Sequence, residues 1–248
     1  TGVDGMLVGE PEDGIAAIAG LASTEQFAEV PSLTFRRGTE IVPHRGHGSF
    51  TGFLEAPYPA WDLLDLSVYR LPLVNQRYVL VETSRGCPYT CDFCVAPIHQ
   101  GNKFRQRTAK ELVDEIERGY REFGLTFFYL WGDTVTLHVK AFSAFCEELI
   151  ARQLPVQWFG NARADNLTDP EFVKRLRQAG CWMLALGIET ESEDTRKDML
   201  KRLDGEKIRL ALKNMRAAGI RSFGFFILGY PGDDRASLDR TIDYAIEL

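Results

Sequence analysis

The stretch Y-V-L-V-E-T-S-R-G-C-P-Y-T-C-D-F-C, residues 78–94, joins a short apolar strand to a cluster of cysteines. Cys87, Cys91 and Cys94 form a C-x3-C-x2-C pattern there, and this spacing arises by chance in such a chain roughly two times in a thousand. The odd total of five cysteines argues against a disulfide framework. Because cysteine thiolates bind soft metals and iron–sulfur clusters, the pattern predicts a metal centre directly after a strand.

Several metal centres fit three cysteines. A structural zinc site needs a fourth ligand, which His99 could supply, although zinc modules usually pair two separated cysteine knuckles. An iron–sulfur electron carrier needs four cysteines, but Cys146 lies on an apolar helix face and Cys181 starts a strand, so we expect both to be core thiols. Three thiolates on one loop favour a cubic cluster with one iron left open.

Short apolar strands alternate with amphipathic helices from Arg77 to the end of the chain, which is typical of parallel strand–helix units. The expected strands are 78–83, 126–131, 156–159, 182–188 and 222–228. Five such units fit either an open doubly wound α/β sheet or most of a closed barrel. Both folds place the loops after the strands on one common face, where ligands bind.

Capping patterns place the helices between these strands. Thr108 with Glu111, and Thr168 with Glu171, each spell a Ser/Thr-x-x-Glu capping box at the start of a helix. An apolar stripe predicts a further helix over 139–152. The helical stretch after the fourth strand is broken at Gly205, and a last helix follows the fifth strand.

Residues 1–76 have a different pattern. A strand over 3–8 precedes a helix rich in Ala and Ile, and so small a pair cannot bury itself. We therefore expect residues 1–30 to be the end of a domain whose start is missing, and the turn-rich segment 31–76 to be a connector between domains. The chain begins at Thr1 and ends in a helical pattern without a cap, so we expect both ends to be cut.

The composition limits the classes of function. The chain of 248 residues is 45% hydrophobic and 26% charged, and no apolar run approaches the ~18 residues of a membrane span. Its 29 basic and 35 acidic residues give a net charge of −6, so no overall positive field attracts nucleic acid. We expect a cytoplasmic protein that acts on a small-molecule substrate, with no nucleic-acid partner and no membrane span.

The cysteine loop resembles that of the radical S-adenosylmethionine (SAM) superfamily, which follows the first strand of a partial (β/α)6 TIM-like barrel. The resemblance implies that Cys87, Cys91 and Cys94 each ligate one iron of a 4Fe-4S cluster, and that SAM chelates the fourth iron. It implies reductive cleavage of SAM to methionine and a 5′-deoxyadenosyl radical, with the electron supplied by a partner such as flavodoxin or ferredoxin. It also implies that the core, residues 77–248, is truncated before its sixth strand.

Further residues match cofactor-binding positions of this superfamily. Phe93 would lie near the adenine, and Gly132 with Asp133 partly matches a Gly-Gly-Glu element that contacts the SAM amino group. Glu189, in G-I-E-T, matches a polar position near the ribose, and Gly229 belongs to a glycine-rich strand end that packs against the adenosyl group.

These positions have structural alternatives as well. Gly132 and Asp133 could form only a turn, and Glu189 could belong to a buried ion pair. Asn161 and Arg163 are candidates for SAM or substrate contact, with turn formation as an equal alternative. Arg105 and Arg107 could steer a carboxylate, but solvation is the favoured interpretation. No catalytic side chain is assigned.

The N-terminal part narrows the resemblance. V-D-G-M-L-V-G-E-P-E, residues 3–12, and L-E-A-P-Y-P-A-W-D-L-L, residues 54–64, resemble the end of a Rossmann-like cobalamin-binding domain and its linker in the cobalamin-dependent branch. This resemblance implies cobalamin as a third cofactor, and methyl transfer or a related C–H functionalisation of an organic substrate. The alternatives are an enzyme of the anaerobic magnesium-protoporphyrin ester cyclase type, a non-catalytic iron–sulfur electron carrier and a zinc-stabilised interaction module.

Overall fold

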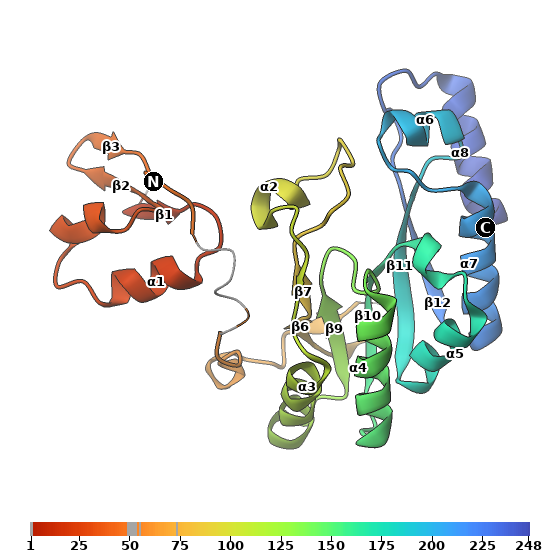
Figure 1. Ribbon diagram of the computed structural model, residues 1–248, viewed down its shortest axis with the longest axis horizontal. Helices are drawn as coiled ribbons and strands as arrows, with labels where there is room; N and C mark the ends of the chain where they lie inside the picture. Colours follow the sequence, from red (N-terminus) through yellow and green to blue (C-terminus); the bar gives the residue numbers. More distant parts are fainter. Residues whose placement is uncertain (1, 49–53, 55, 73) are drawn as a thin grey trace. The chain divides into compact units, whose positions relative to one another are not determined.

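A computed structural model describes residues 2–48, 54, 56–72 and 74–248, in which two compact units are distinguished (Figure 1). The first unit consists of residues 1–59, 86–88 and 95–105, and the second of residues 60–85, 89–94 and 106–248. Thr1 and part of the predicted connector, residues 49–53, 55 and 73, lie outside the described residues. The division into three parts at residues 30 and 76 stays a prediction.

The first unit is built on a small antiparallel sheet. Its strands β1 (Gly5–Leu7), β2 (Leu33–Arg37) and β3 (Glu40–Val42) pair in the order β1-β2-β3. The unit also contains α1 (Glu12–Ala19), the 3-10 helix η1 (Thr24–Glu29) and, from the cysteine loop, α2 (Ala96–Gln100). The predicted N-terminal strand and helix are thus confirmed, whereas β2 and β3 arise within a segment predicted only to be turn-rich.

The second unit contains one five-stranded parallel sheet. Its strands are β6 (Val79–Glu82), β9 (Phe127–Trp131), β10 (Gln157–Ala162), β11 (Cys181–Glu189) and β12 (Arg221–Phe226). They pair in the order β12-β11-β10-β9-β6, so strands of this sheet that follow one another along the chain are also neighbours in the sheet. All five predicted strands are confirmed, and their carboxyl ends share one edge.

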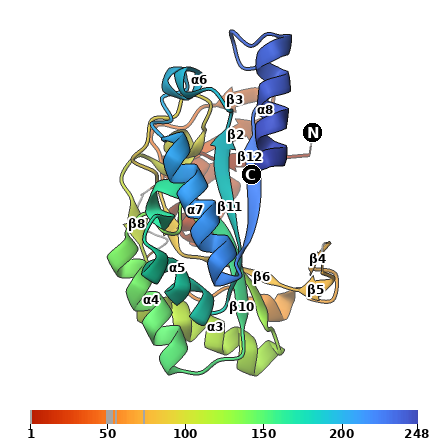
Figure 2. The same ribbon diagram turned by 90° about the vertical axis from the view of Figure 1, so that its right-hand side faces the viewer.

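Four helices cover one face of this sheet (Figure 2): α3 (Ala109–Phe123), α4 (Val139–Ala151), α5 (Pro170–Gln178) and α7 (Gly205–Ala218). Alternate strand residues, among them Phe128, Leu130 and Trp158, are buried in the core beneath them. The intervening residues of β9 and β10 lie on the opposite face, where the rings of Tyr129 and Phe159 stack at 4.6 Å. This face is rich in aromatic side chains.

Shorter elements complete the second unit. The 3-10 helices η3 (Trp61–Leu63) and η4 (Ala164–Leu167) flank the core, and β4 (Arg70–Leu71) pairs with β5 (Gln76–Arg77). The remaining helices are α6 (Glu193–Asp198) and α8 (Arg235–Glu247). Two short strands, β7 (Ser84–Arg85) and β8 (Arg105–Gln106), stand at the ends of the cysteine loop in the sequence.

The helix starts test the capping predictions. Thr108 caps α3, and its reciprocal bonds with Glu111 complete the predicted capping box. The box predicted at Thr168 is wrong, because the side chain of Asp169 caps α5 by accepting from the backbone N–H of Glu171. Thr168 instead donates its hydroxyl to the carbonyl of Asp165. The acidic residue one position later is the better placed acceptor.

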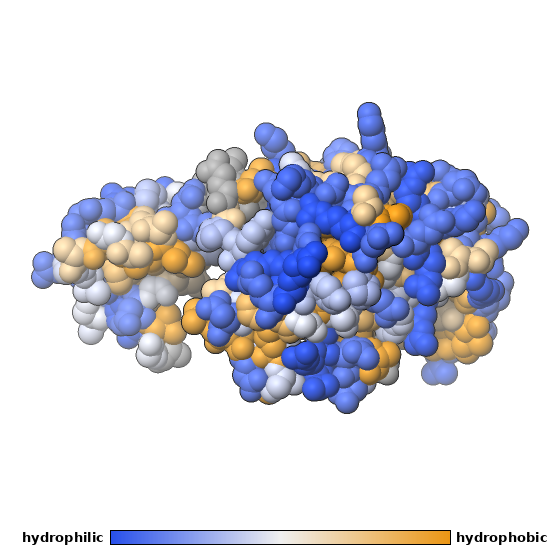
Figure 3. Space-filling view, turned by 90° about the horizontal axis from the view of Figure 1, so that it is seen from below, coloured by the Kyte–Doolittle hydropathy of each residue, from blue (hydrophilic) through white to orange (hydrophobic). Residues whose placement is uncertain are grey.

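Among the described residues, none of the helices combines the length and the apolar character that crossing a bilayer demands. On the face drawn in Figure 3, hydrophobic residues lie in separate groups among hydrophilic ones.

Candidate functional site

The cysteine loop leaves β7 at the carboxyl side of the sheet. Cys87 belongs to the first unit, whereas Cys91 and Cys94 belong to the second, and all three are half-buried. In the second unit the backbone N–H of Cys94 donates to the carbonyl of Cys91 (3.2 Å), and the N–H of Asp92 donates to the carbonyl of Met199 (3.2 Å). Across the described ranges, no group of three or more His, Cys, Asp or Glu side chains is placed to hold a metal ion. Ligation by the three thiolates therefore stays a prediction.

Two cations lie near the thiol of Cys91. Burial raises the pKa of this thiol, and the positive charges of Lys201 and Arg163 oppose that shift. Arg163 follows β10, and its guanidinium carbon lies 3.8 Å from the ring centre of Tyr89 in the cysteine loop. Its charge is also paired with Asp165 at 3.1 Å. The structure thus places the predicted residue Arg163 beside the loop, where it favours a thiolate.

Glu189, at the end of β11, forms a buried ion pair. Its carboxylate accepts from the ammonium of Lys201, and the two side chains are 7% and 8% exposed. The backbone of Glu189 has a φ of 70°, and the register with β12 shifts at this point. Gly187 lies two residues before it, where a Cβ would overlap both charged groups. The buried ion pair named as the alternative for Glu189 is therefore present.

The ion pair also borders the cysteine loop. The ammonium of Lys201 lies 5.9 Å from the ring centre of Phe93, the residue before Cys94. The side chain of Phe93 is 40% exposed. An aromatic side chain with this much exposed surface can contact a planar base.

Gly132 and Asp133 follow β9. A Cβ at Gly132 would lie 2.6 Å from the hydroxyl oxygen of Ser84 and 2.9 Å from that of Thr83, so close packing requires glycine here. Burial, followed by the negative charge of Glu82, raises the pKa of Asp133. Within the described part of the chain, the buried oxygen Oδ2 of Asp133 has no hydrogen-bond partner. A hydrogen-bond donor of a ligand would satisfy this oxygen.

Asn161 lies within β10 and takes no part in the turn weighed for it. Its amide donates to the hydroxyl of Tyr129 (3.2 Å), on the aromatic face of the sheet. Its own carbonyl accepts from the N–H of Val135 (2.9 Å). The side chain therefore lies on the face opposite the helices, one register position before the strand ends.

The loop after β12 reaches the cysteine loop through a side chain that the sequence did not identify. Gly229 has a φ of 84°, and its N–H donates to Asp233 (3.0 Å). The hydroxyl of the next residue, Tyr230, donates to the carboxylate of Asp92 (2.5 Å) and its pKa is raised to about 12 by that bond. Gly229 thus stands beside a residue that contacts the loop between Cys91 and Cys94.

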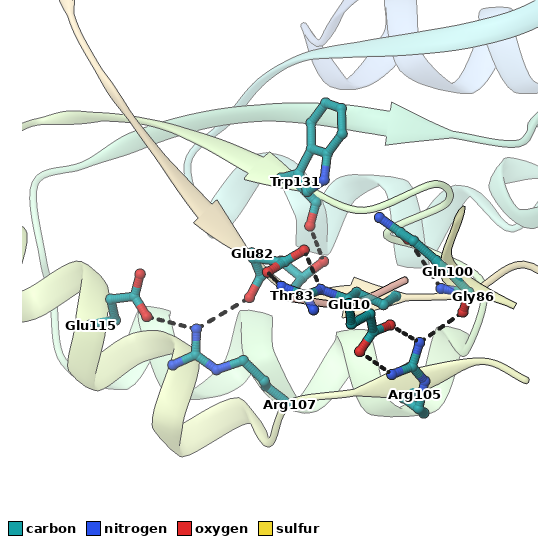
Figure 4. Close-up of polar contacts among 10 residues, drawn as sticks. Glu10, Glu82, Thr83, Gly86, Gln100, Arg105, Arg107, Glu115 and Trp131 are labelled. Atoms are coloured by element: carbon teal, nitrogen blue, oxygen red, sulfur yellow. Dashed lines mark hydrogen bonds and ion pairs between the residues drawn. The ribbon is translucent and has the colours of Figure 1, made fainter. Parts of the chain in front are cut away.

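The prediction that Arg105 and Arg107 are solvated is wrong. Arg105 is 8% exposed and bonds to Glu10 within the first unit, and Arg107 bonds to the buried Glu115 within the second (Figure 4). Both guanidinium groups form ion pairs with buried carboxylates, which sequence position alone does not reveal. The core thiols, in contrast, are confirmed: Cys146 and Cys181 are fully buried, and burial raises the pKa of Cys146 to about 12.

Lys201 and Tyr230 are the residues that the sequence reasoning missed. Lys201 belongs to no motif, and Tyr230 directly follows Gly229 in the glycine-rich strand end, where only the glycine was given a role. The general rule that loops after parallel strands converge was the only available signal. The structure brings Arg163, Glu189, Phe93 and Cys91 together, whereas no described contact joins Asp133 to this group.

The family comparison agrees with this geometry. The sequence model of the Radical SAM superfamily matches residues 81–245, from the second residue after the start of β6 into α8. The matched segment contains the cysteine loop and the predicted cofactor-binding positions.

Two curated proteins resemble the chain over most of its length. The anaerobic magnesium-protoporphyrin IX monomethyl ester cyclase of Cereibacter sphaeroides is 30% identical over 246 residues, which cover 96% of this chain and 40% of that protein. The cytidylyl-2-hydroxyethylphosphonate methyltransferase of Streptomyces wedmorensis is 28% identical over 240 residues, with 88% and 44% covered.

A solved structure shares the fold. The radical S-adenosylmethionine methyltransferase TsrM of Kitasatospora setae, with cobalamin and a [4Fe-4S] cluster bound, matches with a TM-score of 0.76 at 20% identity. The match covers 99% of this chain and 51% of TsrM. The chain thus spans from 40% to about half of the length of these three proteins.

Proposed function

Because the chain belongs to the radical SAM superfamily, we propose that it binds a 4Fe-4S cluster and SAM and serves cobalamin-dependent methyl transfer, or a related C–H functionalisation, of an organic substrate. Family membership indicates an enzyme rather than a non-catalytic electron carrier or a zinc module. The observation that carries the proposal is the group of Cys91, Arg163, Lys201 and Glu189 at the carboxyl end of a parallel sheet. Ligands bind at this edge in open sheets and in barrels alike.

In this proposal the chain supplies ligands and positioning groups. Cys87, Cys91 and Cys94 hold the cluster, and Oδ2 of Asp133 accepts a hydrogen bond from the SAM amino group. When bound, the cluster and SAM supply reductive cleavage of the sulfonium and a radical that abstracts hydrogen from a substrate. The positive charges of Arg163 and Lys201 favour the thiolate form of Cys91, which is the form that ligates iron.

In the proposal, the other predicted residues contact SAM or the substrate around the cluster. Phe93 offers its exposed surface to the adenine, Glu189 ends β11, and Gly229 lies in the loop after β12. Asn161 lies on the aromatic face of the sheet together with Tyr129. Burial of the reacting groups against this face would keep water from a radical.

The cobalamin part of the proposal is supported by the N-terminal residues. The likeness to cobalamin-bound TsrM covers 99% of the chain, so it includes the first unit. We propose that residues 1–30 are the end of a cobalamin-binding domain, 31–76 a connector and 77–248 the radical SAM core. A cytoplasmic location and a reducing partner such as flavodoxin or ferredoxin belong to the same proposal.

SAM cleavage is the first test. Full-length protein, reconstituted anaerobically with iron and sulfide, should form 5′-deoxyadenosine from SAM when dithionite supplies one electron. Cys91→Ala should abolish this product, whereas Cys146→Ala, which removes a buried thiol outside the loop, should retain it. Stoichiometric zinc without iron, or equal product from wild type and Cys91→Ala, would refute the proposal.

A second candidate, cyclisation of the kind named for the Cereibacter sphaeroides relative, is favoured by that relative's 30% identity. Methyl transfer from SAM leaves S-adenosylhomocysteine, whereas hydrogen abstraction leaves 5′-deoxyadenosine and methionine. Formation of both nucleoside products, with cobalamin retained by the full-length protein, supports methyl transfer. Formation of 5′-deoxyadenosine alone in the presence of bound cobalamin supports the cyclase-like reaction.

A further inference from the structure

A buried ion pair in the first unit joins the N-terminal segment to the cysteine loop (Figure 4). The guanidinium of Arg105 donates to both carboxylate oxygens of Glu10, from Nη1 at 2.9 Å and from Nη2 at 2.5 Å. Their side chains are 6% and 3% exposed. A bidentate hydrogen-bonded pair of planar groups fixes their relative orientation as well as their distance, so the position of the Arg105 side chain depends on that of Glu10.

The pair continues into the loop through backbone groups. Nη2 of Arg105 also donates to the carbonyl of Gln100 (2.8 Å), at the end of α2. The side-chain oxygen of Gln100 accepts from the N–H of Gly86 (3.2 Å), and the carbonyl of Gly101 accepts from the N–H of Cys87 (3.2 Å). Three successive hydrogen bonds therefore connect the carboxylate of Glu10 with the backbone N–H of Gly86, the residue before Cys87.

The backbone on both sides of this connection has little room to shift. Gly86 has a φ of 83°, and a Cβ there would overlap the carbonyl of Lys103. At the other end, the N–H of Gly48 donates to the carbonyl of Val8 (3.1 Å), and a Cβ at Gly48 would overlap the carbonyl of Glu10. Close backbone packing thus holds the two ends of the connection.

We propose that Glu10 is a positioning residue for the iron–sulfur cluster: through Arg105 and Gln100 it holds the backbone that orients Cys87. The inference rests on the proposed function, because it takes Cys87 to be a cluster ligand. It assigns to the N-terminal segment a role in keeping the cluster bound. Groups that orient a metal ligand are commonly worth roughly 10- to 100-fold in metal affinity or activity.

Cluster retention tests this role. In the full-length, reconstituted protein, the rate at which a chelator removes iron should rise about 10-fold in Glu10→Gln and in Arg105→Lys. The matched control is Glu115→Gln, which breaks another buried Arg–Glu pair, with Arg107, outside the loop. This control should keep the wild-type rate, and the low-temperature electron paramagnetic resonance spectrum of its reduced cluster should be unchanged.

Gln100 provides a test that leaves the ion pair intact. Gln100→Leu removes the acceptor for Gly86, whereas Gln100→Glu retains an acceptor oxygen. Gln100→Leu should lose iron about 10-fold faster and show an altered spectrum, and Gln100→Glu should restore retention toward that of the wild type. This comparison remains informative even when the two charge variants fold poorly.

The possible failures are distinguishable. Wild-type iron loss and spectra in Glu10→Gln, Arg105→Lys and Gln100→Leu would overturn the positioning role while leaving SAM cleavage, and so the proposed function, in place. Equal acceleration in Glu115→Gln would overturn it too, because general loss of stability would then be the cause. A wild-type protein that takes up no cluster would refute the proposed function itself.

Discussion

Buried charged side chains lie at the carboxyl edge of the sheet, and they differ in whether they have partners. Glu189 and Lys201 satisfy each other next to Phe93, whereas one oxygen of Asp133 lacks a partner among the described residues. A buried charge without a partner is costly, so the two cases make opposite predictions for stability.

Lys201→Met should lower the free energy of unfolding by about 3–5 kcal/mol, because it leaves the carboxylate of Glu189 buried without its partner. The double variant Glu189→Gln/Lys201→Met should recover most of that loss, since no isolated charge remains. Urea unfolding of Lys201→Met, Glu189→Gln and the double variant measures the coupling free energy between the two side chains. Equal stabilities for Lys201→Met and the double variant would contradict this account.

Asp133→Asn should have the opposite effect on stability. Because burial raises the pKa of Asp133, the folded protein binds the proton more tightly than the unfolded chain does. Stability from this group is present below its ordinary pKa and is lost as the pH rises through the higher folded value. The advantage of Asp133→Asn should therefore grow from near zero at pH 4 to about 1 kcal/mol at pH 7, a low figure because the carboxyl is only half-buried.

Urea unfolding of wild type and Asp133→Asn at several pH values between 4 and 7 checks this prediction. A difference that does not change with pH would show that the carboxylate is not the cause. The same variant should bind SAM more weakly in equilibrium dialysis, since it loses the negative acceptor proposed for the ligand's amino group.

Candidate site residues could be predicted from the sequence where their spacing, or their position relative to a strand, forms a recognisable pattern. The cysteine pattern follows from three positions in eight residues, and Arg163 and Glu189 follow from their places after strands. Lys201 and the Glu10–Arg105 pair were not predictable, because their partners lie 12 and 95 positions away in the sequence. No local pattern specifies which distant carboxylate a buried cation will meet.

At the scale of elements, the strands were easier to place than the ends of helices. The strands β6, β9, β10 and β11 each have buried apolar residues on at least one face, so hydrophobicity marks them, whereas β12 at the edge of the sheet is mostly exposed. The hairpin of β2 and β3 has few buried residues and was missed, although Gly38, with a φ of 60°, lies at its turn. The cap of α5 was misplaced by one residue because Thr168 and Asp169 are both good caps.

The cap of α5 can be tested directly. Asp169→Ala should destabilise the protein by about 1 kcal/mol, because its carboxylate accepts from the N–H of Glu171 at 3.0 Å. Thr168→Ala, the matched variant one position earlier, should change stability by less than about 0.5 kcal/mol. Urea unfolding distinguishes the two, and the reverse order would restore the capping box expected from the sequence.

At the scale of the whole molecule, the two units differ in the size of their cores. Among the described residues of the first unit, Val30, Leu33 and Phe35 form a small buried hydrophobic core. The core of the second unit extends from Trp61 to Tyr244 and includes large side chains such as Trp158 and Phe142. Local stability follows the amount of buried apolar contact, so the units should open with different free energies.

Hydrogen exchange followed by mass spectrometry measures this difference. Amides of β1, β2 and β3 should exchange at least about 10-fold faster than those of β10 and β11 in the same sample. Central strands such as β10 have neighbours on both sides, which adds to their protection. Equal protection of the two sheets would indicate that the protein opens as a single cooperative unit.

The bond between Tyr230 and Asp92 bears on the order in which the protein is made. It joins residues that are 138 positions apart, and Met199, whose carbonyl accepts from the backbone N–H of Asp92, is also far downstream. At about 5–20 residues per second, the ribosome needs roughly 7–28 s to pass from the cysteines to Tyr230. Until Tyr230 has been synthesised, the loop of Cys91 and Cys94 lacks at least one of the contacts that shape it. Under the proposed function, in which these thiols hold the cluster, iron and sulfide are therefore delivered after β12 has been translated, because the loop has its final contacts only then.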